Sequence, residues 1–357
     1  MEEPIIRRSL ALHAPLRRTP YVMLRRMLEQ VTPETPPDGP EGPVARLERR
    51  LAGLLGTDAA LFFPSGTMAQ QTALRVHAER RGRRGFAAHP HSHLDVWEQQ
   101  SYNAVHGLWR HRLGDPHELL TAADLRAVGE PLAAVVWELP QRDLGGLLPT
   151  WDELNEQVAV ARESGAAAHL DGARIFEAQT YYRRPLDEIA GLFDSVYVSL
   201  YKSIQGVRGA VLAGDEAFLA EAGVWRQRLG GGIRDAWPLA IAAEAGLDDL
   251  LERMPAFRDH AVAIAAAVTA DGVATVVPDP PLTPLFHLHL AAPRAAVERA
   301  GAELLAERGV QLYLRVRSAS DPNRCAFEIT VGENAMGFEP AEVVELLHDL
   351  MKRATSA

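Results

Sequence analysis

Several features that would place this chain outside the common soluble enzymes are missing from its sequence. Its single cysteine, Cys325, leaves no partner for a disulfide within the chain. No run of 18 apolar residues occurs, and Met1–Pro4 is not a basic segment followed by an apolar one, so neither a membrane span nor a secretory signal is predicted. A basic surplus is absent too, because 37 Lys and Arg against 47 Asp and Glu give a net charge of −10. Such a charge disfavours nucleic acid and anionic membranes, so we expect a cytoplasmic protein that binds neither.

Apolar material is plentiful. The 357 residues, 47% of them hydrophobic, suffice for one large domain and a smaller one. Up to about residue 250, short apolar strands alternate with helical patterns, which predicts an α/β domain with a largely parallel sheet covered on both faces. The expected strands of this domain are Ala59–Phe63, Ala133–Trp137, Ala166–Leu170, Ser195–Leu200 and Ala210–Ala213.

The pattern changes after about Leu250 to that of a smaller α+β domain. Its expected elements are the strands Leu285–Leu290 and Ala326–Val331 and the helices Arg294–Glu307 and Pro340–Lys352. At the other end, a short helix around Tyr21–Gln30 precedes the proline-rich loop Pro33–Pro43. We therefore predict an N-terminal arm and loop at 1–43, a large domain at 44–250 and a small domain at 251–357.

Two of the expected strands carry chemically informative residues at their ends. Asp171 closes the strand before Gly172, and Lys202 follows the strand that begins at Ser195. Strands of a parallel sheet deliver such residues to one edge. An acid and a lysine placed this way suit pyridoxal phosphate, since the lysine forms a Schiff base and the acid keeps the pyridine nitrogen protonated.

Gly66 and Thr67 lie where the strand Ala59–Phe63 turns into a helix. The free N–H groups and the positive end of a helix bind phosphate well. Alone, Ser65-Gly66-Thr67 is more typical of a plain turn with a threonine cap, but Asp171 and Lys202 downstream favour the phosphate site.

His89, His91 and His93 alternate along the chain and would share one face of a strand. No carboxylate-rich or cysteine motif accompanies them, so a metal site is not predicted. Two interpretations remain, a polar loop and an imidazole that stacks on a flat cofactor ring as an acid or base.

Taken together, these segments resemble the threonine aldolase and β-eliminating lyase family of fold-type I pyridoxal-phosphate enzymes. The resemblance covers roughly Leu51 to Asp249. It rests on the order and spacing of five segments, which begin at Phe63, His93, His169, Tyr201 and Trp225 and include Asp171-Gly172-Ala173-Arg174 and Gly230-Gly231-Gly232. It implies an aspartate-aminotransferase-like large domain with a mainly parallel seven-stranded sheet, and a homodimer or homotetramer.

The resemblance also implies a role for each matching residue. Lys202 would bind the cofactor covalently, Asp171 would pair with the pyridine nitrogen, His93 would stack on the ring and move protons, and Gly66 and Thr67 would hold the phosphate. Arg174 would belong to the cofactor-binding residues and would also bind the substrate carboxylate, a task that suits the two parallel donors of a guanidinium. Ser9 and Arg324 occupy places of further carboxylate ligands, with Arg315 and Arg317 as competitors for Arg324.

The chain departs from the family pattern on the substrate side. Ser9 is followed by Leu10 and Ala11 where relatives continue with Asp-Thr, and Gln141 stands where aldolases hold a histidine near the substrate hydroxyl. A glutamine cannot remove a proton, although it can hydrogen-bond a hydroxyl.

Three functions remain open on the sequence alone. The first is a lyase that cleaves, or forms, the Cα–Cβ bond of a β-hydroxy-α-amino acid, giving glycine and an aldehyde, with His93 as the base. The second keeps pyridoxal phosphate but catalyses β-elimination, transamination or another condensation of an amino acid. The third is a binding protein in which Lys202 is structural.

Overall fold

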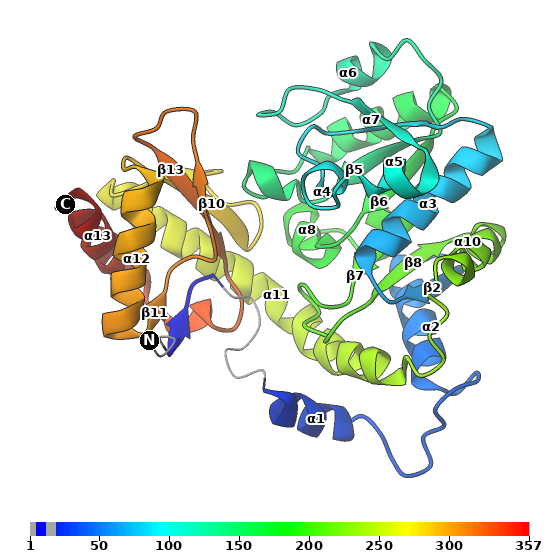
Figure 1. Cartoon of the computed structure of the whole chain (residues 1–357), viewed down its shortest axis with the longest axis horizontal. Helices are drawn as coiled ribbons and strands as arrows, with labels where there is room; N and C mark the ends of the chain where they lie inside the picture. The colour runs from blue at the N-terminus through cyan, green and yellow to red at the C-terminus, as the bar shows by residue number, and fades with distance from the viewer. Residues whose placement is uncertain (1–4, 12–18, 357) are drawn as a thin grey trace. The chain divides into compact units, whose positions relative to one another are not determined.

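The structure is a computed structural model, and it describes residues 5–11 and 19–356. By its internal contacts the chain forms two compact units. The larger comprises residues 23–143 and 148–251, and the smaller comprises residues 144–147, 252–356 and the described part of 1–22. Figure 1 shows the elements of both. The limits predicted from the sequence, 1–43, 44–250 and 251–357, stay predictions.

The larger unit is built on a seven-stranded sheet with the order β2-β8-β7-β6-β5-β3-β4. Neighbouring strands run parallel from β7 to β4, whereas β8 is antiparallel to both β7 and β2. The strands are β2 (Ala59–Phe63), β3 (Gly85–Ala88), β4 (Trp109–Arg112), β5 (Ala134–Glu138), β6 (Ala167–Asp171), β7 (Ser195–Ser199) and β8 (Ala210–Gly214). The predicted α/β fold with a mainly parallel seven-stranded sheet is confirmed.

Helices accompany the strands of this unit. They are α1 (Pro20–Leu28), α2 (Pro43–Leu55), α3 (Gly66–Arg81), α4 (His93–Val96), α5 (Ser101–His106), α6 (Ala122–Arg126), α7 (Trp151–Glu163), α8 (Ile175–Tyr182), α9 (Leu186–Ala190), α10 (Glu216–Arg228), the first part of α11 (Trp237–Asp271), and the 3-10 turn η1 (Arg142–Leu144).

Helix α3 lies at the centre of this arrangement, because it packs across β5, β6, β7 and β8 (Figure 1). It begins after Ser65, whose hydroxyl accepts the N–H of Met68, and it ends at Gly82, which adopts the left-handed conformation. Its apolar side packs with α10 on the sheet in a core that includes Phe63, Ala73 and Phe218.

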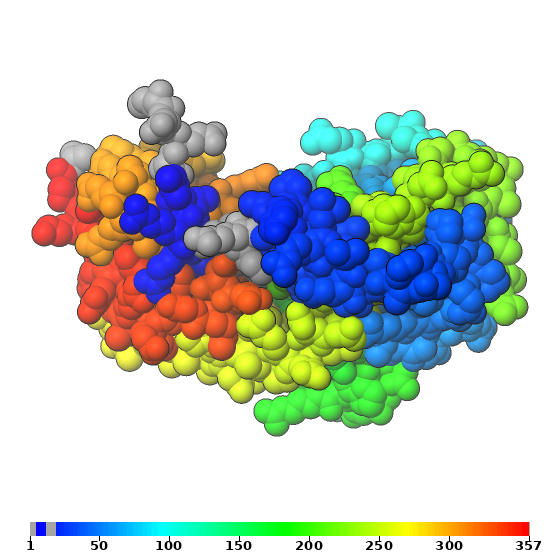
Figure 2. Space-filling view, turned by 90° about the horizontal axis from the view of Figure 1, so that it is seen from below, coloured from blue at the N-terminus to red at the C-terminus, as the bar shows by residue number. Residues whose placement is uncertain are grey.

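Helix α1 contributes nothing to the core, since none of its side chains is buried. Arg26 connects it to the first part of α11, donating to the carbonyl of Ala245 and to the carboxylate of Asp249. Figure 2 shows this helix as dark blue surface, and Tyr21, Leu24 and Leu28 are 70%, 62% and 70% exposed.

The smaller unit holds an antiparallel sheet with the order β12-β13-β10-β9 and a parallel pair, β1-β11. Its elements are β1 (Arg8–Ser9), β9 (Thr275–Val277), β10 (Leu285–Leu290), β11 (Val310–Gln311), β12 (Val316–Ser318), β13 (Cys325–Thr330), α12 (Arg294–Arg308), α13 (Pro340–Thr355), η2 (Ala335–Gly337) and the second part of α11. No helix in the described parts of either unit is long and apolar enough to cross a membrane.

Candidate active site

Three neighbouring strands of the larger unit end at one edge of the sheet with polar residues. Glu138 closes β5 and is in register with Asp171, which closes β6 and is in register with Tyr197 of β7. The chain leaves β7 at Ser199, one residue earlier than predicted, and Lys202 lies in the turn that comes next. This edge is where parallel α/β sheets place ligands.

The amino group of Lys202 is in an unusual electrostatic environment. Burial lowers its pKa to about 8, and the positive charge of Arg174 acts in the same direction, whereas Asp171 and Glu138 act against it. A lysine with a lowered pKa carries more of the uncharged, nucleophilic amine at neutral pH. Lys202 therefore suits Schiff-base formation with an aldehyde.

Asp171 is the last residue of β6, and Arg174 directly precedes α8. The carboxylate of Asp171 is 3% exposed, and its Oδ1 accepts the N–H of Ala173. Arg174 is also buried, and its Nε lies 3.7 Å from Oε1 of Glu177, which accepts a hydrogen bond from Ser203 beside Lys202. No sequence signal pointed to Glu177, which lies within α8 three residues after Arg174.

The predicted phosphate site lies at the start of α3. The first N–H groups of a helix have no partner within the helix, and here Ser65 occupies only that of Met68. A side chain at Gly66 would be impossible without rearrangement, since a Cβ atom there would lie 2.2 Å from the hydroxyl oxygen of Tyr197. The glycine thus keeps backbone close to the strand edge, with the N–H groups of Gly66 and Thr67 in the first turn.

His93 opens α4 and is oriented from both its backbone and its ring. Its N–H donates to Oε2 of Glu138 over 3.2 Å, and its Nδ1 lies 3.2 Å from Oε1 of Glu98, whose other oxygen accepts from Gln71 of α3. Since the carboxylate of Glu98 only accepts, Nδ1 carries a proton, and the lone pair of a singly protonated ring lies on Nε2. This arrangement fits an acid–base residue, and the side chain of His93 remains 26% exposed.

Glu138 is a further member of the site, and the sequence motifs alone did not single it out. It accepts the N–H groups of His93 and Arg142, at 3.2 and 3.3 Å. Burial raises its pKa to about 7, with smaller contributions from the charges of Asp171 and Asp143. The available signal was its position, a carboxylate at the end of an apolar strand beside the strand that ends in Asp171.

Gln141 is buried on the loop after β5. Its Nε2 donates to the carbonyl of His91 over 3.2 Å and lies 3.5 Å from Oε2 of Glu138. The other two candidates, Ser9 and Arg324, belong to the smaller unit. Ser9 is fully buried with its hydroxyl donating to Gln311, and Arg324 is exposed before β13.

The three alternating histidines do not share a strand face. His89 contacts the carbonyls of Asp115 and Glu118, His91 lies on the turn after β3, and only His93 joins the site. Across the described residues, no group of three His, Cys, Asp or Glu side chains has the geometry of a metal site.

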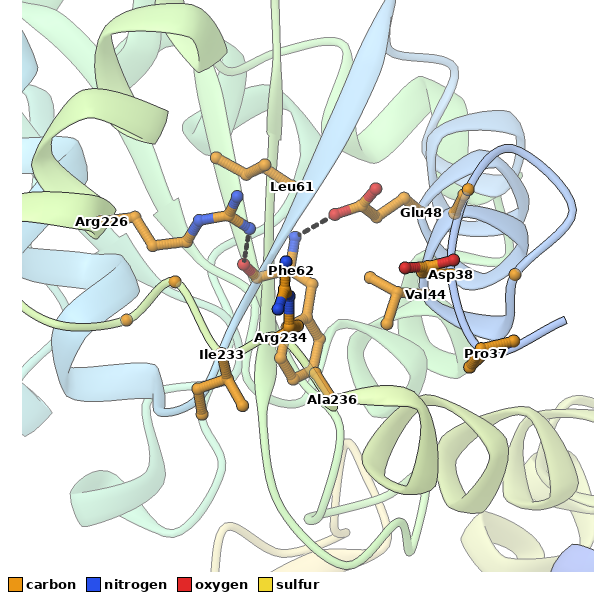
Figure 3. Close-up of a pocket in the computed structure, with 15 residues that line it drawn as sticks. Pro37, Asp38, Val44, Glu48, Leu61, Phe62, Arg226, Ile233, Arg234 and Ala236 are labelled. Atoms are coloured by element: carbon orange, nitrogen blue, oxygen red, sulfur yellow. Dashed lines mark hydrogen bonds between the residues drawn. The ribbon is translucent and has the colours of Figure 1, made fainter.

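Figure 3 shows a separate pocket of about 270 Å³ at β2. Glu48 accepts the N–H of Phe62 over 2.7 Å. Arg226 donates to the carbonyl oxygen of Phe62, also over 2.7 Å. The pocket is lined by Pro37, Asp38, Gly39, Gly42, Val44, Ala45, Glu48, Leu61, Phe62, Arg226, Gly231, Gly232, Ile233, Arg234 and Ala236. It contains the glycine segment noted in the sequence but not Lys202, Asp171 or His93.

Residues 23–293 match the family model described as β-eliminating lyase. Over 227 residues the chain is 29% identical to low-specificity L-threonine aldolase 1 of Arabidopsis thaliana, covering 60% of this chain and 62% of that one. It is 30% identical over 249 residues to low specificity L-threonine aldolase of Escherichia coli K12, covering 66% and 71%. The chain thus spans a little under two thirds of the plant relative.

Solved structures show a more extensive similarity. A putative L-allo-threonine aldolase from Listeria monocytogenes superimposes with a TM-score of 0.90 at 32% identity, over 98% of this chain and 96% of that one. Threonine aldolase of Leishmania major has the same fold, with a TM-score of 0.74 at 20% identity over 98% and 100%.

Proposed function

Because the chain belongs to the β-eliminating lyase family, we propose that it is a pyridoxal-phosphate-dependent carbon–carbon lyase. Its substrate is a β-hydroxy-α-amino acid, cleaved between Cα and Cβ to glycine and an aldehyde, or formed from them. The observation that carries this proposal is the convergence of Lys202, Asp171 and the start of α3 on one sheet edge, with the lowered pKa of Lys202. The aldolase names of the relatives support the choice of bond.

The residues of the site fit pyridoxal phosphate. The close approach of backbone at Gly66 leaves helix N–H groups for a phosphate, Lys202 offers an amine for the aldehyde, and Asp171 offers a carboxylate for the ring nitrogen. When bound, pyridoxal phosphate supplies the ring that accepts the electrons of the broken bond.

The chain's own groups divide the remaining work. Arg174 binds the substrate carboxylate through paired hydrogen bonds. His93 takes the proton of the β-hydroxyl at Nε2, directly or through a water, because Glu98 holds its Nδ1. Gln141 contributes its amide to binding the substrate hydroxyl. Ser9 and Arg324 are proposed as further substrate contacts.

A second reaction class is favoured by one observation, the presence of Gln141 where aldolases hold a histidine. Its amide cannot act as a base, and β-elimination, transamination or another condensation would not need one at the β-hydroxyl. These reactions would use the same cofactor site.

Measuring glycine release decides between the aldolase reaction and the alternative reactions. We would assay threonine, allo-threonine and aryl-serines with the wild type, Gln141→Ala and Gln141→His, while recording ammonia and oxo-acid. For the aldolase we expect Gln141→Ala to weaken substrate binding by about 0.5–1.5 kcal/mol, the loss of one hydrogen bond, and Gln141→His to raise threonine cleavage. No glycine from any substrate with all three proteins, together with ammonia or oxo-acid from the wild type, would overturn the aldolase and establish the alternative.

We also propose that the protein is a homodimer or homotetramer in the cytoplasm. The exposed Tyr21, Leu24 and Leu28 of α1 support assembly, since apolar surface of this kind commonly lies in an interface. Light scattering of the purified protein measures the assembly, and a monomer at micromolar concentration would contradict it.

A further inference from the structure

Polar side chains cross the core of the larger unit between α3 and the sheet, beneath Asp171. Residues i and i+2 of a strand point to one face, so His169 and Asp171 of β6 share a face, and His169 is in register with Ser195 of β7. Gln70 and His77 are seven residues apart on α3, which places them on one side of that helix.

These side chains form one continuous series of hydrogen bonds. Nε2 of Gln70 donates to Oδ2 of Asp171, and Oε1 of Gln70 lies 2.6 Å from Nε2 of His169. Nδ1 of His169 lies 2.7 Å from the hydroxyl of Ser195, which in turn lies 2.7 Å from Nε2 of His77. We call Gln70, His169, Ser195 and His77 the Asp171 support chain.

The chemistry of the groups fixes the direction of every bond. A carboxylate only accepts, so Gln70 must present its NH₂ to Asp171 and its carbonyl to His169. His169 must then carry its proton on Nε2. Burial lowers the pKa of His169 to about 3, so the ring is neutral and its Nδ1 accepts from Ser195.

With its proton given to His169, the Ser195 hydroxyl can only accept from His77. Burial also holds the pKa of His77 well below its usual value, which leaves this ring neutral with the proton on Nε2. All donors therefore point toward Asp171. His77 also stacks on Phe218 in the core, with 4.8 Å between the ring centroids.

Burying this series of polar side chains puts the free energy of folding at risk, because every member needs its partner. The members are at most 2% exposed, and a buried polar group that loses its partner costs about 1–3 kcal/mol. An apolar core at these positions would need no exact pairing. The opposite face of the same strands is apolar, with Leu170, Val196 and Val198.

We propose that the support chain positions Asp171. Gln70 holds Oδ2 from the side of α3 while the N–H of Ala173 holds Oδ1, so the carboxylate keeps one orientation toward the ring nitrogen of pyridoxal phosphate. Neutral donors accomplish this without adding a positive charge that would compete with the ring nitrogen. This inference rests on the proposed use of pyridoxal phosphate, but not on which bond is broken.

The first experiment needs no cofactor. In apoprotein with ¹⁵N-labelled histidine, the ring nitrogen shifts report protonation and tautomer, and His169→Asn and His77→Asn assign the signals. We expect both rings to be neutral with the proton on Nε2 at pH 7, and Ser195→Ala to shift both signals. A proton on Nδ1 of His169, or a doubly protonated ring, would overturn the proposal.

The second experiment compares two matched variants. Gln70→Leu removes the donor to Asp171, whereas Gln157→Leu removes an equally buried glutamine, 3% exposed, that bonds Trp137 and Leu120 away from the site. For Gln70→Leu we expect kcat to fall and the Kd of pyridoxal phosphate to rise, each by about two- to tenfold for one hydrogen bond, with KM unchanged. Gln157→Leu should lower Tm while kcat and Kd stay at wild-type values.

Wild-type kcat and Kd in folded Gln70→Leu would overturn the positioning role. If Gln70→Leu does not fold, Ser195→Ala replaces it, with a smaller change in the same direction expected, and no change would overturn the role. A failure of the proposed function would give a different result from a failure of the support chain. A wild type that binds pyridoxal phosphate but releases no glycine leaves the Kd comparison and the histidine spectra to decide on the support chain alone.

Discussion

Lys202 is one of only two lysines in the chain, and the other, Lys352, is exposed on α13. A covalent cofactor site on a lysine can therefore be tested simply. Borohydride reduction of the cofactor-loaded enzyme should fix the label on the peptide that contains Lys202. Lys202→Ala should keep the fold and lose turnover by orders of magnitude, because it removes the only amine at the strand edge.

Lys352→Ala is the matched control and should keep full activity. A label on the peptide with Lys352, read by mass spectrometry, would show that Lys202 is not the covalent site.

Substitution of Asp171 tests the proposed contact between its carboxylate and the pyridine nitrogen. In Asp171→Asn the helix start at Gly66 remains, so cofactor binding should weaken less than turnover. We expect kcat to fall about 100-fold or more, since an uncharged partner no longer keeps the pyridine nitrogen protonated. Turnover and the Kd of pyridoxal phosphate, measured side by side, check this. Near-normal turnover would place the ring nitrogen elsewhere.

Among the helices and strands, α3 allows a specific prediction, because its first residue, Gly66, has no room for a side chain. A methyl group at Gly66 would collide with the hydroxyl of Tyr197, and overpacking of this kind costs about 1–3 kcal/mol. Gly66→Ala should therefore lower Tm and weaken pyridoxal phosphate binding in a fluorescence titration.

Gly53 of α2 provides the comparison, because a Cβ atom there meets nothing within 4 Å. Gly53→Ala should leave cofactor binding unchanged and raise stability by up to about 1 kcal/mol, the helix preference of alanine over glycine. Equal effects of the two substitutions on cofactor binding would contradict the close approach at Gly66.

The strands that could be predicted from the sequence were those that form an apolar run with clear ends. The strands β2 and β10 begin and end as predicted, because apolar runs such as Ala59–Phe63 are bounded by polar or turn residues. The strands β3 and β4 were missed. Gly85–Ala88 is only four small or aromatic residues long, and Trp109–Arg112 carries three polar side chains at the sheet edge.

The same contrast holds for the site. Asp171, Lys202 and Gly66 could be found because each follows or ends a strand within a recognisable segment. Gln70 and His169 could not be assigned a role, because a buried polar residue acquires one only through its partner on another element. Their pairing joins residues 99 positions apart, which no local pattern expresses.

For the molecule as a whole, Glu138 predicts a dependence of stability on pH. Its pKa rises from 4.5 to about 7 on folding, so between these values the folded chain holds a proton that the unfolded chain has released. The unfolded state binds fewer protons in this window, and raising the pH through it lowers the free energy of unfolding.

In apoenzyme, Glu138→Gln should lose less stability between pH 5 and 7.5 than the wild type, as measured by guanidinium unfolding. Glu163→Gln, a change at an exposed position of α7, should follow the wild type. Identical pH dependence in all three proteins would show that Glu138 is ionised throughout.

The arrangement around α3 has a practical consequence for anyone who wishes to redesign the enzyme. The start of this helix and its buried side reach both the proposed phosphate site and Asp171, whereas Gln141 and its neighbours belong to the separate loop after β5. Mutant libraries confined to residues 139–143 should yield clones with new substrate preferences, most of them still yellow with cofactor. Libraries in the first three turns of α3 should yield mostly colourless ones.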